Sequence, residues 1–322
     1  MKKRDFLKAG IVAGAAAGIS GPLGTPALAM GSDDKSKHKT GFLLLHGSWH
    51  GAWAWTEVAR HLNQAGYPTI AIDFPGHGLD AILPQSFTTR PLDAAAFASE
   101  PSSIATFGIA DYEEAVLDAA KQARAAGIRN LIAVGHSMAG VPLTFAAAKR
   151  PKLFAGLVYL AALLPTKGKP AGAYLGLPDQ AKNSKLGAAI AADPDVIGAL
   201  RIDPRSQDEA YRAALKEALA ADVDEKLFGA VVHLLTPDAP VSIYGELASL
   251  GKGYGRLPKR FIRATHDKTV LASTAQAIVD DVNANWPNQT CHMIDIAASH
   301  EVMFAQAKLL SNLLLEAAKA PK

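Results

Sequence analysis

The stretch from Gly135 to Gly140 is the sequence feature that most constrains the fold of this chain. It follows a short apolar run at residues 130–134 and precedes an alanine-rich run at residues 141–149 that has helical character. A strand, a sharp turn and a helix in this order place Ser137 at the end of the strand and at the N-terminus of the helix. Small residues around the serine let the strand and the helix approach each other closely. The stretch therefore predicts a turn that presents the Ser137 hydroxyl as a nucleophile.

The usual pattern for such a turn is G-x-S-x-G, and Ala139 stands here at the position of its last glycine. Alanine is still small, and Gly140 follows it directly. The departure from the pattern is therefore mild. A serine can also occur by chance in a glycine-rich turn, so the prediction depends on partners elsewhere in the chain.

Apolar runs and helical patterns alternate along most of the sequence. We expect strands at residues 41–45, 69–72, 130–134, 156–160, 260–264 and 290–296. We expect helices at residues 55–66, 109–126, 141–149, 272–285 and 302–318. Strands that alternate with helices predict an α/β fold with a doubly wound, mostly parallel sheet.

This alternation stops near Pro165 and returns at about residue 256. Residues 166–255 are rich in Ala, Asp, Lys and Pro and suggest short, interrupted helices. We therefore expect a core made of residues 30–165 and 256–322, with residues 166–255 inserted as a helical cap.

The first 29 residues have the composition of an export signal. Residues 2–8 are basic, residues 9–21 are apolar and small, and residues 27–29 form an A-x-A cleavage site. The apolar stretch is too short and too rich in glycine to form a stable membrane span. We expect the mature protein to begin near Met30 and to be exported, to the periplasm of a bacterium.

The basic leader resembles a twin-arginine export motif, except that Lys3 replaces the first arginine. Both the twin-arginine route and the general secretion route therefore remain open. The leader contains four basic residues and one acidic residue, so its net charge equals the +3 of the whole chain. The mature protein is then nearly neutral, which gives no electrostatic reason to expect nucleic acid or an anionic membrane as a partner.

Metal and thiol chemistry have little support in the sequence. Most of the ten histidines show no metal-ligand spacing, and we expect neither a metal nor a cofactor. Cys291 is the single cysteine, so no disulfide can form within the chain. Because it lies in a predicted buried strand, we interpret it as a core residue rather than as a reactive thiol.

A serine nucleophile needs a base, and the base needs a group that orients it. In a fold of this kind the partners follow in the chain order Ser, Asp, His, each in a loop at the carboxyl end of a strand. Asp267 follows the run at 260–264, and His300 follows the run at 290–296. We predict Ser137 as the nucleophile, His300 as the general base and then acid, and Asp267 as the residue that fixes the imidazole tautomer.

Acyl transfer also requires N–H donors for the developing oxyanion. The sequence His46-Gly47-Ser48 follows the first apolar run, where such a fold places its second donor. We predict that the backbone N–H groups of Ser48 and Met138 form the oxyanion hole. His46 is expected to be a structural residue of this loop.

These motifs resemble the α/β-hydrolase superfamily and, within it, the branch of plant methylesterases and hydroxynitrile lyases. The resemblance rests on residues 42–55, 134–140, 264–268 and 295–304. The serine turn is typical of the superfamily, and the stretch Trp49-His50-Gly51-Ala52-Trp53 is more specific to the branch. The cap region carries no recognisable motif.

Two positions separate esterases from lyases in this branch. The lyases typically have a threonine after the histidine of the first loop and a lysine after the catalytic histidine, where it stabilises the developing cyanide. The matching residues here are Gly47 and Glu301. An acidic side chain beside a leaving anion would oppose its release. The resemblance therefore implies an esterase that acts on small aromatic or alkyl carboxylic esters.

The sequence thus predicts a carboxylesterase-type serine hydrolase with a small-molecule ester as substrate. Lactones, thioesters and amides would use the same groups. Two alternatives from other classes stay open: a hydroxynitrile lyase that uses the same site, and a non-catalytic ligand-binding protein on the same scaffold.

Overall fold

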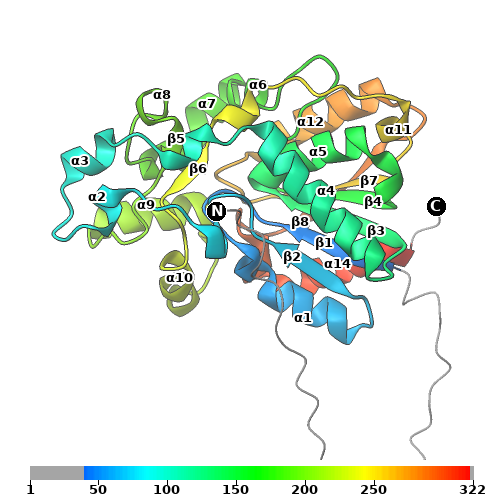
Figure 1. Ribbon diagram of the computed structural model, residues 1–322, viewed down its shortest axis with the longest axis horizontal. Helices are drawn as coiled ribbons and strands as arrows, with labels where there is room; N and C mark the ends of the chain where they lie inside the picture. Colours follow the sequence, from blue (N-terminus) through cyan, green and yellow to red (C-terminus); the bar gives the residue numbers. More distant parts are fainter. Residues whose placement is uncertain (1–39, 320–322) are drawn as a thin grey trace, which may run out of the picture. The chain divides into compact units, whose positions relative to one another are not determined.

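The computed structural model describes residues 40–319. The predicted export signal at residues 1–29 lies outside the described residues. The central sheet has six strands in the order β2-β1-β3-β4-β7-β8, and every neighbouring pair is parallel (Figure 1). Its strands are β1 (Thr40–Leu45), β2 (Thr69–Ile72), β3 (Asn130–His136), β4 (Gly156–Leu160), β7 (Lys259–Ala264) and β8 (Cys291–Ile296).

Each of these strands begins within one residue of its predicted position. The predicted doubly wound, mostly parallel sheet is confirmed. The central strands β1, β3 and β4 are almost entirely buried, whereas the edge strands β2 and β8 are partly exposed. Continuous apolar runs form the centre of the sheet because helices cover both of its faces.

Helices pack on the two faces in separate groups. The core helices are α1 (Thr56–Gln64), α4 (Ile109–Ala125), α5 (Gly140–Lys149), α12 (Ala272–Asn285), α13 (Val302–Ala305) and α14 (Ala307–Lys319). Helices α4, α5 and α12 cover one face, and α1 and α14 cover the other. Along β1, Leu43 faces the first group and Leu44 the second, as the alternation of side chains in a strand requires.

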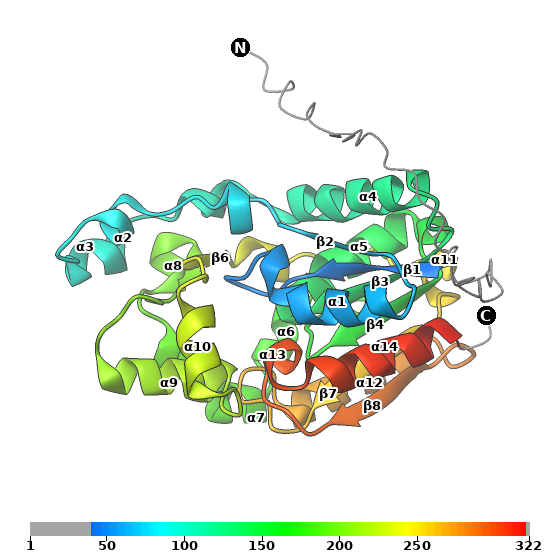
Figure 2. The same cartoon turned by 90° about the horizontal axis from the view of Figure 1, so that it is seen from below.

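Alternate β3 residues follow the same rule, so the serine turn is attached to a strand that is packed on both sides. Leu131 and Ala133 contact the cluster of α4, α5 and α12, whereas Ile132 and Val134 contact the cluster of α1 and α14. Figure 2 shows α4 and α14 on opposite sides of the strands.

Short 3-10 helices join many of the elements: η2 (Ala52–Trp55), η3 (Gly78–Asp80), η4 (Ser103–Thr106), η5 (Ser137–Ala139), η6 (Pro151–Leu153), η7 (Leu186–Ala189) and η8 (Ser242–Tyr244).

One predicted helix is divided. The pattern at residues 302–318 predicts a single helix, but the structure has α13 and α14 with a break at Gln306, whose φ of −136° is outside the helical range. The short α13 buries Val302 and Met303 beside α1 and η2, while α14 runs along α1. One straight helix cannot pack in both directions, and the hydrophobic pattern of the sequence does not reveal where the direction of packing changes.

The chain between β4 and β7 contains helices and a small sheet. Its elements are α6 (Gly172–Leu175), α7 (Pro178–Asn183), α8 (Pro194–Ile197), α9 (Glu209–Leu219), α10 (Glu225–Val232), α11 (Lys252–Gly255), β5 (Ala199–Arg201) and β6 (Asp238–Pro240). The expected short helices are present, and β5 and β6 form in addition an antiparallel pair that the sequence pattern did not predict. Each of these strands has only three residues, too few for a period-two pattern to be recognised.

A second excursion from the core lies between β2 and α4. It contains α2 (Gln85–Thr88) and α3 (Ala94–Ser99) and packs beside α8, β5 and β6 (Figure 1). The sequence analysis assigned no element to this segment. Among residues 40–319, no helix has both the length and the hydrophobicity to span a membrane.

Candidate active site

Ser137, His300 and Asp267 come together at one edge of the sheet. They follow the carboxyl ends of β3, β8 and β7, which the parallel arrangement places side by side. His300 Nε2 lies 2.9 Å from Ser137 Oγ, and His300 Nδ1 lies 2.7 Å from Asp267 Oδ2. Only 7% of Ser137, 5% of Asp267 and 2% of His300 is exposed. The structure thus brings the three predicted residues into one hydrogen-bonded chain.

The backbone at Ser137 has the left-handed conformation that a sharp turn requires. Its φ is +52°, and it begins η5 between β3 and α5. A Cβ at Gly140 would lie 2.4 Å from the carbonyl oxygen of Leu163, so only glycine fits this approach. Ala139 is buried in the position of the missing glycine. The strained turn projects the serine away from the strand and toward His300.

Asp267 is fixed by its own loop. Its Oδ1 accepts hydrogen bonds from the backbone N–H groups of Thr269, at 2.7 Å, and Val270, at 3.0 Å. Its Oδ2 is thereby directed at the ring of His300. Since a carboxylate accepts, Nδ1 of His300 donates, and Nε2 is left to accept the proton of Ser137.

Opposing effects act on the pKa of His300. Burial lowers it, because a charged imidazolium is poorly solvated in the interior. The charge of Asp267, the hydrogen bond to Asp267 and the charge of Glu301 raise it. These attractive interactions outweigh burial, and the pKa of His300 lies above its usual 6.5. The site therefore stabilises the protonated state that a general base passes through.

Ser48 and Met138, the predicted oxyanion donors, flank the serine. Met138 is the second residue of η5, where an N–H group has no partner within the helix. Ser48 follows β1 in the loop of residues 46–51, which we call the oxyanion loop, and its backbone N–H donates to no acceptor in residues 40–319. A Cβ at Gly47 would lie 2.7 Å from His136 Nδ1 and 3.0 Å from Ser137 Cβ, so the loop touches the serine turn.

Two buried histidines near the site are occupied by structural hydrogen bonds. His46 Nδ1 donates to the Gly47 carbonyl at 2.8 Å, and its Nε2 accepts from the N–H of Phe74 at 3.0 Å. His136 Nε2 donates to the carbonyl of His300 at 3.1 Å. Burial lowers the pKa of both His46 and His136 well below the usual value. Neither ring therefore competes with His300 as the base.

Contacts from the segment between β4 and β7 hold the oxyanion loop. Trp49 has a φ of +66°, its indole N–H donates to the carbonyl of Leu200 at 2.9 Å, and its own carbonyl accepts from the N–H of Thr236 at 2.8 Å. The Ser48 side chain also interacts with Tyr244, lowering a pKa that burial raises. These partners cannot be predicted from the sequence, because no local pattern relates residues 151 and 187 positions apart.

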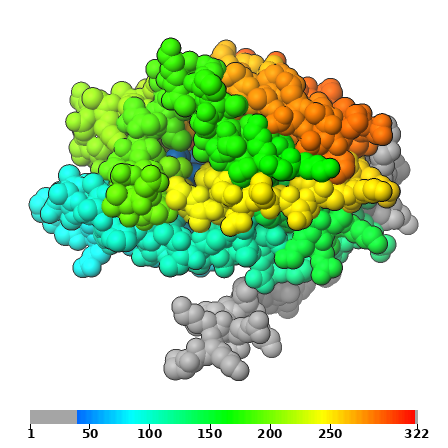
Figure 3. Space-filling view, turned by 90° about the horizontal axis from the view of Figure 1, so that it is seen from above, coloured from blue at the N-terminus to red at the C-terminus, as the bar shows by residue number. Residues whose placement is uncertain are grey.

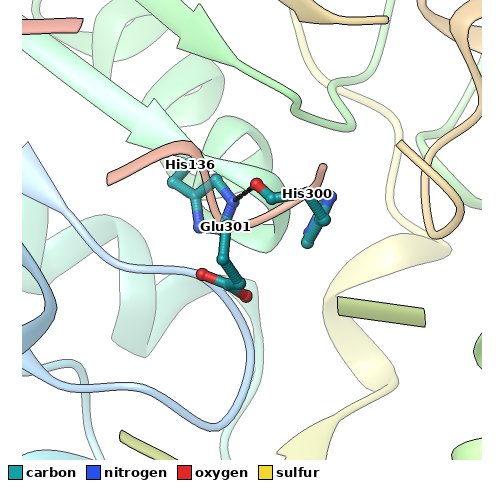
Figure 4. A group of neighbouring side chains, drawn as sticks. All are labelled: His136, His300 and Glu301. Carbon is teal, nitrogen blue, oxygen red and sulfur yellow. Dashed lines mark hydrogen bonds between the residues drawn. The ribbon is translucent and has the colours of Figure 1, made fainter. Parts of the chain in front are cut away.

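A group of side chains beside the site has the composition of a metal site. His136, His300 and Glu301 each offer a ligand atom, and these atoms lie within 4.8 Å of one another. Figure 4 shows the ring of His136 bonded to the backbone of His300, with the Glu301 carboxylate directed away from the His300 ring. Both nitrogens of His300 and one of His136 already have partners, so a cation would have to break the chain that links His300 to Ser137.

Access to the edge of the sheet is visible at the surface. Figure 3 shows a hollow between green and yellow parts of the chain, which belong to the segment between β4 and β7. Blue atoms, the colour of the chain around residue 50, lie at its floor.

The comparisons with known proteins agree with this architecture. A family model described as the alpha/beta hydrolase family matches residues 42–311. Esterase PIR7B of Oryza sativa subsp. japonica is 32% identical over 145 residues, which is 45% of this chain and 45% of that protein. The match thus spans less than half of the rice relative. Methylesterase 1 of Arabidopsis thaliana is 25% identical over 306 residues, covering 88% of this chain and 98% of the relative.

A solved structure supports the fold independently of close sequence similarity. A pyrethroid hydrolase from Sphingobium faniae JZ-2 superposes with a TM-score of 0.66 at 19% identity, covering 88% of this chain and 98% of that one. At this identity the likeness establishes the fold alone. The predicted resemblance to plant esterases and methylesterases is confirmed by the sequence matches.

Proposed function

Because this chain belongs to the alpha/beta hydrolase family, and because Ser137, His300 and Asp267 form one hydrogen-bonded chain, we propose that it is a serine carboxylesterase. The esterase and methylesterase relatives support action on ester bonds. The observation that carries the proposal is the 2.9 Å contact between Ser137 Oγ and a His300 whose other nitrogen is held by Asp267.

The proposed reaction has two halves. Ser137 Oγ attacks the ester carbonyl while His300 takes the serine proton, and the oxyanion is stabilised by the N–H groups of Ser48 and Met138. His300 then gives the proton to the leaving alcohol as the acyl-enzyme forms. Water, deprotonated by His300, attacks the acyl group, and the carboxylic acid leaves with Ser137 restored.

We also propose that residues 166–255 act as a cap that bounds the substrate pocket. Support comes from the position of this segment between β4 and β7 and from its contacts with the oxyanion loop through Leu200, Thr236 and Tyr244. The substrate class proposed is a small carboxylic ester. A series of p-nitrophenyl esters with increasing acyl length would report the size of the pocket through the optimum of kcat/KM.

The decisive experiment compares the purified chain with Ser137→Ala on the same ester series. We expect hydrolysis by the original protein and a loss of about six orders of magnitude in kcat for the variant. A fluorophosphonate should label the original protein at Ser137 and leave the variant unlabelled. Hydrolysis retained by Ser137→Ala would contradict the proposal.

Export of the mature chain is proposed on sequence grounds alone. The basic, apolar and small-residue regions of residues 1–29 support it. N-terminal sequencing of the protein recovered from a periplasmic fraction should give a start near Met30. Recovery of an uncleaved chain in the cytoplasm only would contradict it.

A further inference from the structure

A buried carboxylate beside the site has no role in the chain of Ser137, His300 and Asp267. Glu301 directly follows His300, and only 3% of it is exposed. Its Oε2 lies 3.4 Å from Nε2 of His50, which is 2% exposed, and has no hydrogen-bond partner in the described part of the chain. Burial of such a group is unfavourable unless a neighbouring charge or proton compensates it.

His50 connects this carboxylate to the oxyanion loop. Its Nδ1 lies 2.7 Å from the carbonyl oxygen of Ser48, and since a carbonyl only accepts, Nδ1 carries a hydrogen and donates. The ring packs against Trp53, with centroids 5.3 Å apart, and against Phe304, at 6.0 Å, and these two rings also stack on each other. Its orientation is therefore fixed, with one nitrogen directed at Ser48 and the other at Glu301.

A proton on Nε2 of His50 makes its contact with the Glu301 carboxylate attractive, because an imidazolium then lies beside a negative charge. Nδ1 of His50 remains a donor to Ser48. The contact therefore restrains the backbone at Ser48, next to Trp49 with its strained φ of +66°.

We propose that Glu301 and His50 are positioning residues, which hold Ser48 so that its N–H is aimed at the oxyanion and place a compensating charge behind protonated His300. This inference rests on the proposed esterase function. During acyl transfer negative charge develops on the substrate oxygen and positive charge on His300. Glu301 directly follows His300 in the chain, and His50 donates a hydrogen bond to the Ser48 carbonyl. The pair therefore adjoins both the residue that becomes positive and the residue whose N–H faces the negative oxygen.

The titratable groups around this pair are few. His300 interacts with Asp267, Glu301 and His136. His50 interacts with Glu301 through Nε2 and with the buried rings of His46, His77 and His136. Glu301 is thus a negatively charged residue that acts on His300 and can be replaced while the hydrogen bond between Asp267 and His300 is kept. Its loss has a defined sign: the pKa of His300 falls, and the acid limb of the pH profile moves to lower pH.

The first test is Glu301→Gln, which keeps the shape of the side chain and removes its charge. We expect kcat for a p-nitrophenyl ester to fall about tenfold with little change in KM, because the transition state loses the negative charge that compensates protonated His300. The acid limb of kcat/KM should move to lower pH. Glu113→Gln is the matched control, since Glu113 is also buried and paired, with Lys149, away from the site.

Two further variants separate the effect of the Glu301–His50 contact from the effect of the Glu301 charge. Glu301→Asp keeps a negative charge near His300 but withdraws it from His50, so the acid limb should stay in place while kcat falls. His50→Asn keeps a donor for Ser48 and removes the contact with Glu301. Combined with Glu301→Gln, it should lower kcat no further than the more impaired single variant, because both act through one contact.

A trifluoromethyl ketone, whose tetrahedral adduct places an oxyanion in the same hole, should bind Glu301→Gln about tenfold more weakly. Equal kcat, pH profile and inhibitor binding in Glu301→Gln and Glu113→Gln would overturn the inference while leaving the esterase proposal intact. An original protein that hydrolyses no ester, or an active Ser137→Ala variant, would overturn the esterase function and the inference together. Thermal melting identifies any loss of fold.

Discussion

Asp267 determines which nitrogen of His300 carries the proton. Its Oδ1 is held by two backbone N–H groups, so its Oδ2 meets Nδ1 of the imidazole. The proposed reaction at Ser137 depends on this single tautomer, because only an unprotonated Nε2 can accept the serine proton. The sequence placed Asp267 and His300 at strand ends, and the structure joins them through a 2.7 Å contact.

Asp267→Asn should abolish this control without removing the side chain. The amide oxygen can still accept from Thr269 and Val270, which turns the NH₂ group toward His300 and forces Nδ1 to accept. We expect kcat for ester hydrolysis to fall about 10⁴-fold with the fold retained. Asp295→Asn is the control, since that carboxylate pairs with Arg263 at the surface. Similar kcat values for the two variants would contradict the assigned role of Asp267.

At the scale of elements, the oxyanion loop connects the core to the segment between β4 and β7. The loop follows β1, touches the serine turn at Gly47 and is held from the other side by Leu200 and Thr236. Its position is therefore set by two parts of the chain that lie far apart in sequence. A small displacement of this loop moves the predicted donor at Ser48 relative to the nucleophile.

Gly47→Ala tests this close approach. The added Cβ would lie 2.7 Å from the His136 ring and 3.0 Å from Ser137 Cβ, so the loop must shift away from the turn. We expect kcat/KM for esters to fall about 100-fold, the scale of a misplacement by about one ångström. Gly229→Ala in α10 is the control, because its Cβ meets no atom within 4 Å. Unchanged kcat/KM in Gly47→Ala would show that the loop does not need this contact.

Across the whole molecule, a buried ion pair joins the two excursions from the core. Arg201 of β5 makes two contacts of 2.7 Å with Asp238 of β6, and both are essentially inaccessible to solvent. The same guanidinium donates to the carbonyls of Phe97 and Glu100 in the excursion between β2 and α4. Ser102 adds a hydrogen bond to Asp238 at 2.6 Å. These contacts fix both excursions against each other.

Asp238→Asn should leave the Arg201 charge buried without compensation. We expect the free energy of unfolding to fall by about 3 to 5 kcal/mol. Asp118→Asn, at an exposed pair with Lys121, should change it by less than about 1 kcal/mol. Denaturant titration followed by circular dichroism measures both. A difference below about 1 kcal/mol between the two variants would contradict a supporting role for the buried pair.

Local sequence patterns were sufficient for the sheet and for the residues at its edge. Apolar runs predicted all six strands of the central sheet, because the central strands are buried between helices and the edge strands are partly buried. In a parallel sheet the carboxyl ends of neighbouring strands meet at one edge, so Ser137, Asp267 and His300 could be proposed as a group before their distances were known. Local patterns did not predict the short strands β5 and β6 or the helices α2 and α3, since these elements have too few residues to show a period.

Tertiary structure alone decided which side chains complete the site. Nothing near Glu301 in sequence indicates that its carboxylate meets His50, or that His50 in turn holds Ser48. Nor does any local pattern relate Trp49 to Leu200. Strand and helix periodicity reflects which face of an element is buried, whereas these contacts depend on where loops from distant segments converge. The residues proposed to react could therefore be predicted from the sequence, but the groups proposed to position them could be identified only in the folded molecule.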